Sequence, residues 1–166
     1  MHKTTILLAA TALATLACSK PKPVEVTPRS VQVTTLRAQG LQLALVLDVR
    51  NPNGFAIRAS DVKGTLSLQD GTELGRGSAA DTVTVLAEQT AAVPTNLEMS
   101  WTNLAALAPY ALSPQPLPYK IHGSARIGGE HLNVEVPFDI AGQLTREQVL
   151  QAGMRGAAGL LPATPH

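Results

Sequence analysis

Residues 41–49 read LQLALVLDV, and this stretch decides the fold class. Its apolar residues recur at every second position, as Leu41, Leu43, Leu45, Leu47 and Val49. Successive side chains of a strand point to opposite faces, so a period of two predicts a half-buried β-strand. Residues 91–101 repeat the pattern, with Pro94 on the opposite face. Because proline cannot donate to a strand ladder, we expect this second strand to lie at a sheet edge or to start late.

Turn residues predict two hairpins. Gly128-Gly129 forms a two-residue turn of the kind that needs positive φ angles. The register that follows puts polar residues together on one face, with His122 opposite Glu135, Ser124 opposite Asn133, and Arg126 opposite His131. In the second hairpin, a three-residue loop at residues 69–71 with Gly71 left-handed places Leu66 opposite Leu74.

Helix signals occur in two places. Residues 103–112 are rich in Ala and Leu and are interrupted by Pro109, which predicts a short helix. Residues 146–155 follow Thr145, an N-cap with Gln148 three positions later, while Leu144 and Val149 have the spacing of a hydrophobic staple. We expect this helix to stop at Gly156 and the last residues of segment 143–166 to form a flexible tail. Short strands with turn residues between them indicate an all-β, antiparallel β-sandwich of about seven strands, and a meander or barrel is the alternative.

The N-terminus has the pattern of an export signal. Residues 1–17 combine a basic start, an uncharged apolar run and small residues before Cys18. The run is shorter than the ~20 apolar residues that span a bilayer. The junction resembles the lipobox of bacterial lipoproteins, which implies that Cys18 is lipidated and attaches the protein to a membrane. A soluble periplasmic protein with a chance cysteine is the alternative.

Residues 18–29 contain the lipidated cysteine and a proline-rich stretch that predicts an extended tether. Val24 and Val26 alternate within it, so packing as an edge strand is the other interpretation.

Composition limits the possible partners. The chain has 166 residues, 13 Lys and Arg against 12 Asp and Glu, and a net charge of +1. This balance gives no electrostatic reason to expect nucleic acid as a partner. The single cysteine excludes an internal disulfide, so burial and hydrogen bonds must stabilise the domain.

The strand at residues 41–49 is followed by Asn51, Pro52 and Asn53. Asn side chains bond nearby backbone groups and proline fixes φ, so this triplet predicts a rigid turn. The next hairpin carries a Gly-x-x-Leu-x-x-Gly pattern at Gly71, Leu74 and Gly77.

This order of motifs resembles the WHy domain (water stress and hypersensitive response), which occurs in group 2 late embryogenesis abundant proteins and in bacterial lipoproteins. The family often has an aromatic residue before the hairpin turn, where this chain has Leu66 and Leu68. The resemblance implies a WHy-like domain over residues 30–142, a sandwich similar to fibronectin type III or immunoglobulin domains, and protection of proteins or membranes under desiccation stress without catalysis.

No catalytic or metal-binding set can be assembled from the sequence. His122 and His131 share one face with Glu135 as the single further ligand, and residues several rungs apart cannot bind one ion. We therefore expect no enzyme activity, metal or cofactor.

The expected function is membrane-anchored stress protection at the outer membrane, facing the periplasm, because Ser19 lacks the aspartate that commonly retains lipoproteins at the inner membrane. The expected partners are the membrane, through Cys18, and unidentified client proteins or envelope components. The alternative is an envelope adaptor or a protein that carries lipid between its sheets.

Overall fold

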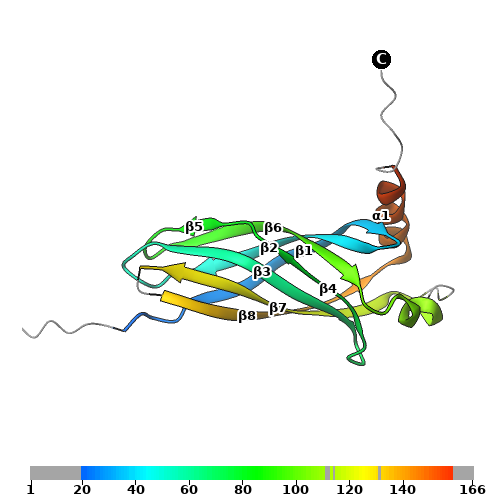
Figure 1. The fold of residues 1–166 in the computed structure, drawn as a ribbon, viewed down its shortest axis with the longest axis horizontal. Helices are drawn as coiled ribbons and strands as arrows, with labels where there is room; N and C mark the ends of the chain where they lie inside the picture. The colour runs from blue at the N-terminus through cyan, green and yellow to red at the C-terminus, as the bar shows by residue number, and fades with distance from the viewer. Residues whose placement is uncertain (1–19, 111–112, 114, 131, 159–166) are drawn as a thin grey trace, which may run out of the picture.

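The computed structural model of the protein describes residues 20–110, 113, 115–130 and 132–158. Cys18 and His131, which the sequence singles out, lie outside this part, as does the predicted tail over residues 159–166. In chain order the elements are β1 (Glu25–Arg37), β2 (Gly40–Arg50), β3 (Ile57–Leu68), β4 (Glu73–Ala79), β5 (Val83–Val85), β6 (Thr90–Trp101), the 3-10 helix η1 (Leu104–Tyr110), β7 (Leu117–Gly129), β8 (Leu132–Leu144) and α1 (Arg146–Ala158) (Figure 1). Neither described helix is long and apolar enough to cross a membrane.

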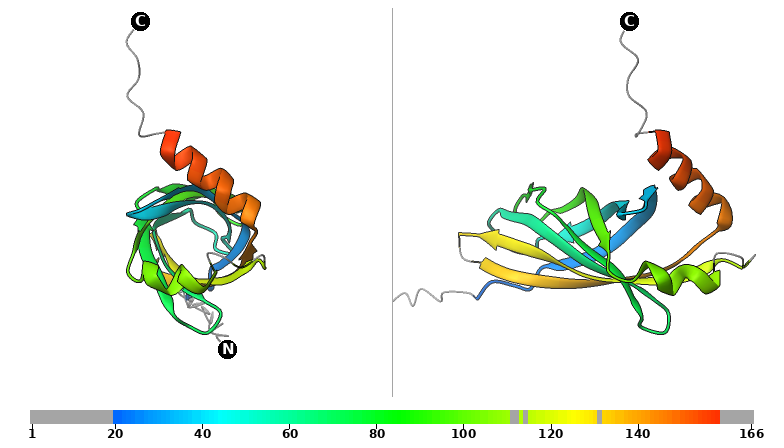
Figure 2. Two further views of the ribbon diagram at one scale, coloured as in Figure 1. Left: turned by 90° about the vertical axis from the view of Figure 1, so that its right-hand side faces the viewer. Right: turned by 45° about the vertical axis from the view of Figure 1, so that its right-hand side comes forward.

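The strands form one antiparallel sheet in the order β1-β2-β6-β4-β3-β7-β8, with β5 paired to β3 beside this path. Long strands twist, and Figure 2 shows the sheet curling until one face is turned inward. The two outermost strands, β1 and β8, contact each other. The all-β antiparallel class is confirmed, whereas a seven-strand sandwich with immunoglobulin or fibronectin III topology is not, because a single curled sheet encloses the core.

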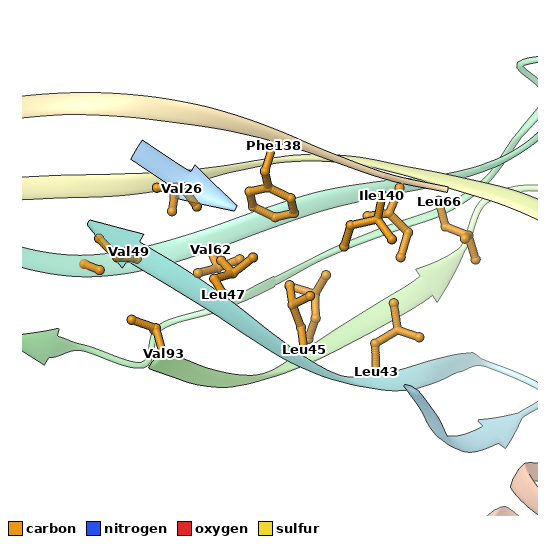
Figure 3. Close-up of a cluster of buried hydrophobic side chains, with 14 of the residues drawn as sticks. Val26, Leu43, Leu45, Leu47, Val49, Val62, Leu66, Val93, Phe138 and Ile140 are labelled. Atoms are coloured by element: carbon orange, nitrogen blue, oxygen red, sulfur yellow. The ribbon is translucent and has the colours of Figure 1, made fainter. Parts of the chain in front are cut away.

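The inward face carries the core that the sequence pattern predicts. All five apolar residues of the β2 alternation are at most 4% exposed. Figure 3 shows the β2 side chains of this face directed towards Phe138 and Ile140 from β8, with Val62 and Leu66 from β3 nearby. Burying side chains of this size stabilises the fold by about 1.5–3 kcal/mol each.

Strand β6 corrects the expectation for Pro94. The strand starts at Thr90 and lies between β2 and β4 in the sheet order, so it is neither an edge strand nor late. Pro94 lies opposite Val46 of β2, whereas β4 pairs only with residues 98–101. The proline is tolerated because β4 does not extend along its half of β6.

The hairpin of β7 and β8 has a different register from the predicted one. His122 lies opposite Asp139, and Arg126 lies opposite Glu135, so the predicted pairs are wrong. The last pair joins Gly129 to Leu132, and the two glycines belong to the strand instead of the turn. The polar and apolar faces are nevertheless as predicted, because the shift moves the partner by an even number of residues.

The hairpin of β3 and β4 confirms the turn but not the pairing. Gly71 has a φ of +91°, which favours glycine, and its N–H donates to the Leu68 carbonyl at 3.0 Å. Leu66 lies opposite Gly75 and not opposite Leu74, because the register shifts between Leu66 and Ser67. The extra residue is a β-bulge at Leu74, which the loop length alone does not reveal.

The N-terminal segment is packed against the domain instead of forming a free tether. Strand β1 begins at Glu25 and pairs with β2 from that residue on. Val24 and Val26 are 7% and 8% exposed and belong to the core. The predicted tether over residues 18–29 is therefore wrong from Val24 onward, and the edge-strand interpretation holds. The free energy gained by burying the two valines exceeds the conformational entropy lost when this segment is ordered.

The two helical segments lie near the predicted places. The first is a 3-10 helix with Pro109 inside it and no buried residue. In α1 the capping box forms, since the Thr145 N–H donates to Gln148 Oε1 at 2.9 Å and the Gln148 N–H donates to Thr145 Oγ1 at 3.3 Å. The helix continues to Ala158, so Gly156 does not stop it. A Cβ on Gly156 would overlap the Leu36 carbonyl, and the glycine therefore lets α1 pack closely on β1.

Candidate functional site

The Asn51 side chain joins three segments of backbone at the end of β2. It is fully buried, and its Nδ2 donates to the carbonyl oxygens of Phe55 at 2.7 Å and Leu86 at 3.0 Å. Its Oδ1 accepts from the Asn53 N–H at 3.1 Å, which is the asparagine turn that the sequence predicts. A buried amide stabilises a fold only when its polar atoms are paired, and these are. Asn51 is thus a structural residue.

Asn53 binds the N-terminal segment. Its Oδ1 accepts from the Lys22 N–H at 2.7 Å, and its Nδ2 donates to the Lys22 carbonyl at 3.1 Å. The Asn53 carbonyl also accepts from the N–H of Glu88, a residue with a φ of +58°. Pro52 lies half-buried between the two asparagines. The motif therefore fixes where the chain enters the domain and which loop covers that end.

The hairpin motif is also explained by packing. Leu74 is 1% exposed, and the carbonyl of this bulged residue accepts from the N–H groups of Thr102 at 2.9 Å and Asn103 at 3.3 Å. These contacts fix the start of η1 against β4. A Cβ on Gly77 would overlap the backbone carbonyl of Glu98, so only glycine lets β4 approach β6 this closely. Neither position offers chemistry.

Polar and charged side chains on the outer face pair with one another. His122 Nδ1 lies 2.7 Å from Asp139 Oδ1, and Arg126 lies between Asp61 at 3.4 Å and Glu135 at 3.6 Å. In the part of the chain that the structure describes, no group of three His, Cys, Asp or Glu residues is close enough to hold a metal ion. Each of these pairs is largely solvated and contributes little to stability.

The β3–β4 turn holds two carboxylates with altered acidity. The Thr72 N–H donates to Asp70 Oδ1 at 2.9 Å and lowers the pKa of that carboxyl below its ordinary value. Arg76 donates to both Glu73 oxygens at 2.8 Å and lowers the pKa of Glu73. Asp70 is exposed and Glu73 is half-buried, and the bonds of both carboxylates are to neighbours in the turn, so we assign them a role in its shape.

An apolar pocket lies at the end of the sheet that carries η1 and α1, remote from Asn53. It has a volume of about 260 Å³. The helices supply Leu107 and Val149 to its apolar lining, and the strands supply the rest, including Leu36, Leu41, Leu66, Leu74, Trp101 and Leu117. Figure 1 shows the two helices at this end and the start of β1 at the other. The pocket is the concave apolar feature that ligand sites in proteins require.

Polar groups of the pocket come from the helical side. Tyr110 is the last residue of η1, Ser113 and Gln115 lie in the loop after it, and Arg146 is the first residue of α1. Deeper in the lining, Tyr119 is 8% exposed, and burial raises its pKa. The Trp101 indole N–H donates to the Arg37 carbonyl at 3.0 Å, which fixes the ring. The arrangement is an apolar interior with a few polar groups around it.

Comparison with known families identifies the domain. The family model described as late embryogenesis abundant protein (LEA_2) matches residues 46–142, more than half of the chain. The chain belongs to this family. The LEA_2 match includes the Asn51-Pro52-Asn53 turn and the hairpin glycines, so the predicted relationship to the WHy group is confirmed. The lipoprotein assignment of Cys18 stays a prediction.

Solved structures share the LEA_2 fold at low identity. AT1g01470 of Arabidopsis thaliana is 18% identical with a TM-score of 0.60, over 83% of this chain and 91% of that one. The late embryogenesis abundant protein At2g46140.1 is 13% identical with a TM-score of 0.50, over 74% and 71% of the two chains. A protein from Archaeoglobus fulgidus is 13% identical with a TM-score of 0.50, over 75% and 95%. Comparison with curated protein sequences gave no significant match. These likenesses concern the fold alone.

Sequence reasoning missed the pocket of this LEA_2 domain. Its lining comes from the ends of strands that are far apart in the chain, such as Leu41, Leu74 and Leu144. The available signal was weak: apolar residues continue to the last position of β6, at Trp101, where a strand end is commonly polar. The curl of the sheet, which no local pattern encodes, brings these residues together.

Proposed function

We propose that the chain is a non-enzymatic stress-protection protein, anchored to a membrane through Cys18, that shields client proteins or the cell envelope as water is lost. The observation that carries this proposal is the LEA_2 match, which covers most of the curled sheet. LEA-type proteins act under stress, and the proposal extends that role to this chain.

The site geometry supports an anchor at a defined end of the domain. Lys22 is bound to Asn53 at the end of β2, and only three residues lie between Lys22 and Cys18. The four steps from Cys18 to Lys22 span about 14 Å when the chain is extended. A lipid on Cys18 would therefore hold the domain close to the membrane with its Asn53 end facing the bilayer. We propose the outer membrane, periplasmic side, as this surface.

The protective role is tested by drying a labile enzyme with the chain from Ser19 onward, with an equal mass of a neutral control protein, or alone. We expect higher recovered activity with the chain from Ser19 than in either control. Recovery equal to that of the control protein would exclude direct client protection. A deletion strain compared with its parent under drying, osmotic and freezing stress extends the test to the cell.

The anchor is tested separately by intact-mass analysis of protein extracted from membranes. The mature chain should begin at Cys18 and carry two or three acyl chains, and the Cys18→Ala variant should stay uncleaved at this site. A mature chain that begins elsewhere without acyl mass would contradict the anchor but leave the protective role open.

A further inference from the structure

We propose that the apolar pocket binds the single acyl chain of an anionic amphiphile, a fatty-acid carboxylate, and that Arg146 binds the carboxylate. This function goes beyond stress protection and does not depend on the anchor at Cys18. It develops the alternative expectation of a lipid carrier, with the interior of one curled sheet in place of a groove between two.

The size of the pocket favours one chain. An apolar cavity of ~150 Å³ accepts benzene, and sites for drug-sized ligands begin near 300 Å³. The pocket has about 260 Å³. This volume suits one short or medium alkyl chain, and a lipid with two long chains would not fit. The strand residues around it, Leu41, Leu66 and Leu74, are each at most 4% exposed and offer no polar partner to a more hydrophilic ligand.

The charge of the lining selects the head group. Arg146 is the only charged residue among the described lining residues. Its guanidinium has no hydrogen-bond or ion-pair partner among residues 20–110, 113, 115–130 and 132–158, whereas Arg155 of the same helix donates to the Thr34 carbonyl at 3.2 Å. The neighbouring carboxylate of Glu147 lies 3.4 Å from the Thr145 hydroxyl. An arginine free to form a two-pronged bond matches a carboxylate.

Apart from Tyr119 of β7, which lies deeper in the lining, the other polar lining residues Tyr110, Ser113 and Gln115 belong to η1 and the loop after it. Ser113 and Gln115 are already linked, since the Gln115 N–H donates to Ser113 Oγ at 3.2 Å. Tyr110 is 36% exposed at the end of η1. The apolar tail would therefore enter among the strand ends, and the carboxylate would stay between η1 and α1, where water and Arg146 both reach it.

The only tryptophan of the chain provides a direct test, because Trp101 lines the pocket. The protein used is the chain from Ser19, which retains every strand and helix of the described structure and the Lys22–Asn53 contact. Bromine quenches indole fluorescence on contact. We expect 11-bromoundecanoate to quench Trp101 saturably and undecanoate to compete with it. The neutral 11-bromoundecanol should bind about threefold to tenfold more weakly.

Two pairs of variants separate binding from general damage. Arg146→Gln should weaken bromoundecanoate binding about threefold to tenfold and leave bromoundecanol binding unchanged. The control is Arg58→Gln, which replaces an exposed arginine of β3 near the other end of the sheet and should leave the binding of both ligands unchanged. Val149→Phe should fill the pocket and abolish saturable quenching. Leu150→Phe, at a position 57% exposed on the same helix, should not. Circular dichroism checks that each variant is folded.

Absence of saturable quenching by bromoundecanoate in the folded chain would overturn the proposal. Equal binding of the alcohol and the carboxylate, or unchanged binding in Arg146→Gln, would overturn the role of Arg146. Quenching by brominated phospholipid vesicles but not by the free carboxylate would assign the pocket to membrane contact and also contradict the proposal.

Discussion

The side-chain amide of Asn53 is paired with the backbone of Lys22, accepting from its N–H at 2.7 Å and donating to its carbonyl at 3.1 Å across 31 positions of sequence. The Asn53 side chain thereby makes the two backbone hydrogen bonds that a neighbouring strand would otherwise make, at the point where the chain enters the domain. The pair joins the family turn to the N-terminal segment, and it determines which end of the sheet an anchor upstream of Lys22 would hold.

Replacement of this amide should release the N-terminal segment. We expect Asn53→Ala to lower the free energy of unfolding by about 1–3 kcal/mol, because the two hydrogen bonds of the buried amide to the Lys22 backbone are lost. Hydrogen exchange should become faster at residues 22–26, with little change in β7. The matched control is Asn96→Ala, at an exposed position of β6. Unchanged exchange near Lys22 would show that the amide does not hold this segment.

The buried Asn51 should not tolerate a negative charge. In Asn51→Asp the introduced carboxyl faces the carbonyl oxygens of Phe55 and Leu86, so burial and these oxygens raise its pKa in the folded state above the unfolded value of ~3.9. A raised pKa means that stability is retained below the unfolded pKa and lost as pH rises. We expect a loss of about 2 kcal/mol or more at pH ~7 and a smaller loss near pH ~4. Urea unfolding at the two pH values measures this loss of stability, with Asn96→Asp as the control. An equal loss of unfolding free energy at both pH values would contradict the prediction.

The close approach of β4 and β6 should exclude any side chain at Gly77. A methyl group there would overlap the Glu98 carbonyl, which belongs to a backbone that cannot move aside without breaking the pairing. We expect Gly77→Ala to destabilise the domain by about 1–3 kcal/mol or to prevent folding. Gly128→Ala is the control, since a Cβ at that position meets no atom within 4 Å. Thermal unfolding of both variants tests this prediction. Similar unfolding midpoints for Gly77→Ala and Gly128→Ala would rule out the steric explanation.

The β3–β4 turn should show the acidity of Asp70 directly. The bond from the Thr72 N–H lowers the pKa of Asp70 below 3.8, so the stabilisation from this bond is present above the unfolded pKa and is lost as pH falls through the lowered value. A carboxyl titration by NMR should give a midpoint below 3.8, and the Thr72 amide resonance should follow the same curve. In Asp70→Asn the Thr72 curve should disappear. A midpoint at or above the ordinary value would contradict the contact.

Local sequence patterns predicted those parts of the structure that local forces form. The alternation in residues 41–49 predicted the buried face of β2, and Gly71 predicted the left-handed turn, because each depends on neighbours along the chain. The Thr145–Gln148 capping box formed for the same reason. The Asn51-Pro52-Asn53 turn was also predicted, although its link to Lys22 was not.

The pairing of distant residues was decided by tertiary structure. The register of β7 and β8 differs from the predicted one because an even shift leaves polar and apolar faces unchanged, so the hydrophobic pattern cannot distinguish the two. Gly156 reads as a helix stop until its contact with Leu36 of β1 is seen.

The sequence by itself thus determined the buried faces of β2 and β6 and the turns at Asn51-Pro52-Asn53 and at Gly71, since these follow from side-chain alternation and backbone preferences over a few residues. Tertiary structure decided that one sheet curls upon itself, that Lys22 binds Asn53, and that Leu41, Leu74 and Trp101 surround a pocket with Arg146 beside it. These features depend on the summed twist of eight strands and on contacts between residues tens of positions apart, for which no short stretch of sequence carries a signal.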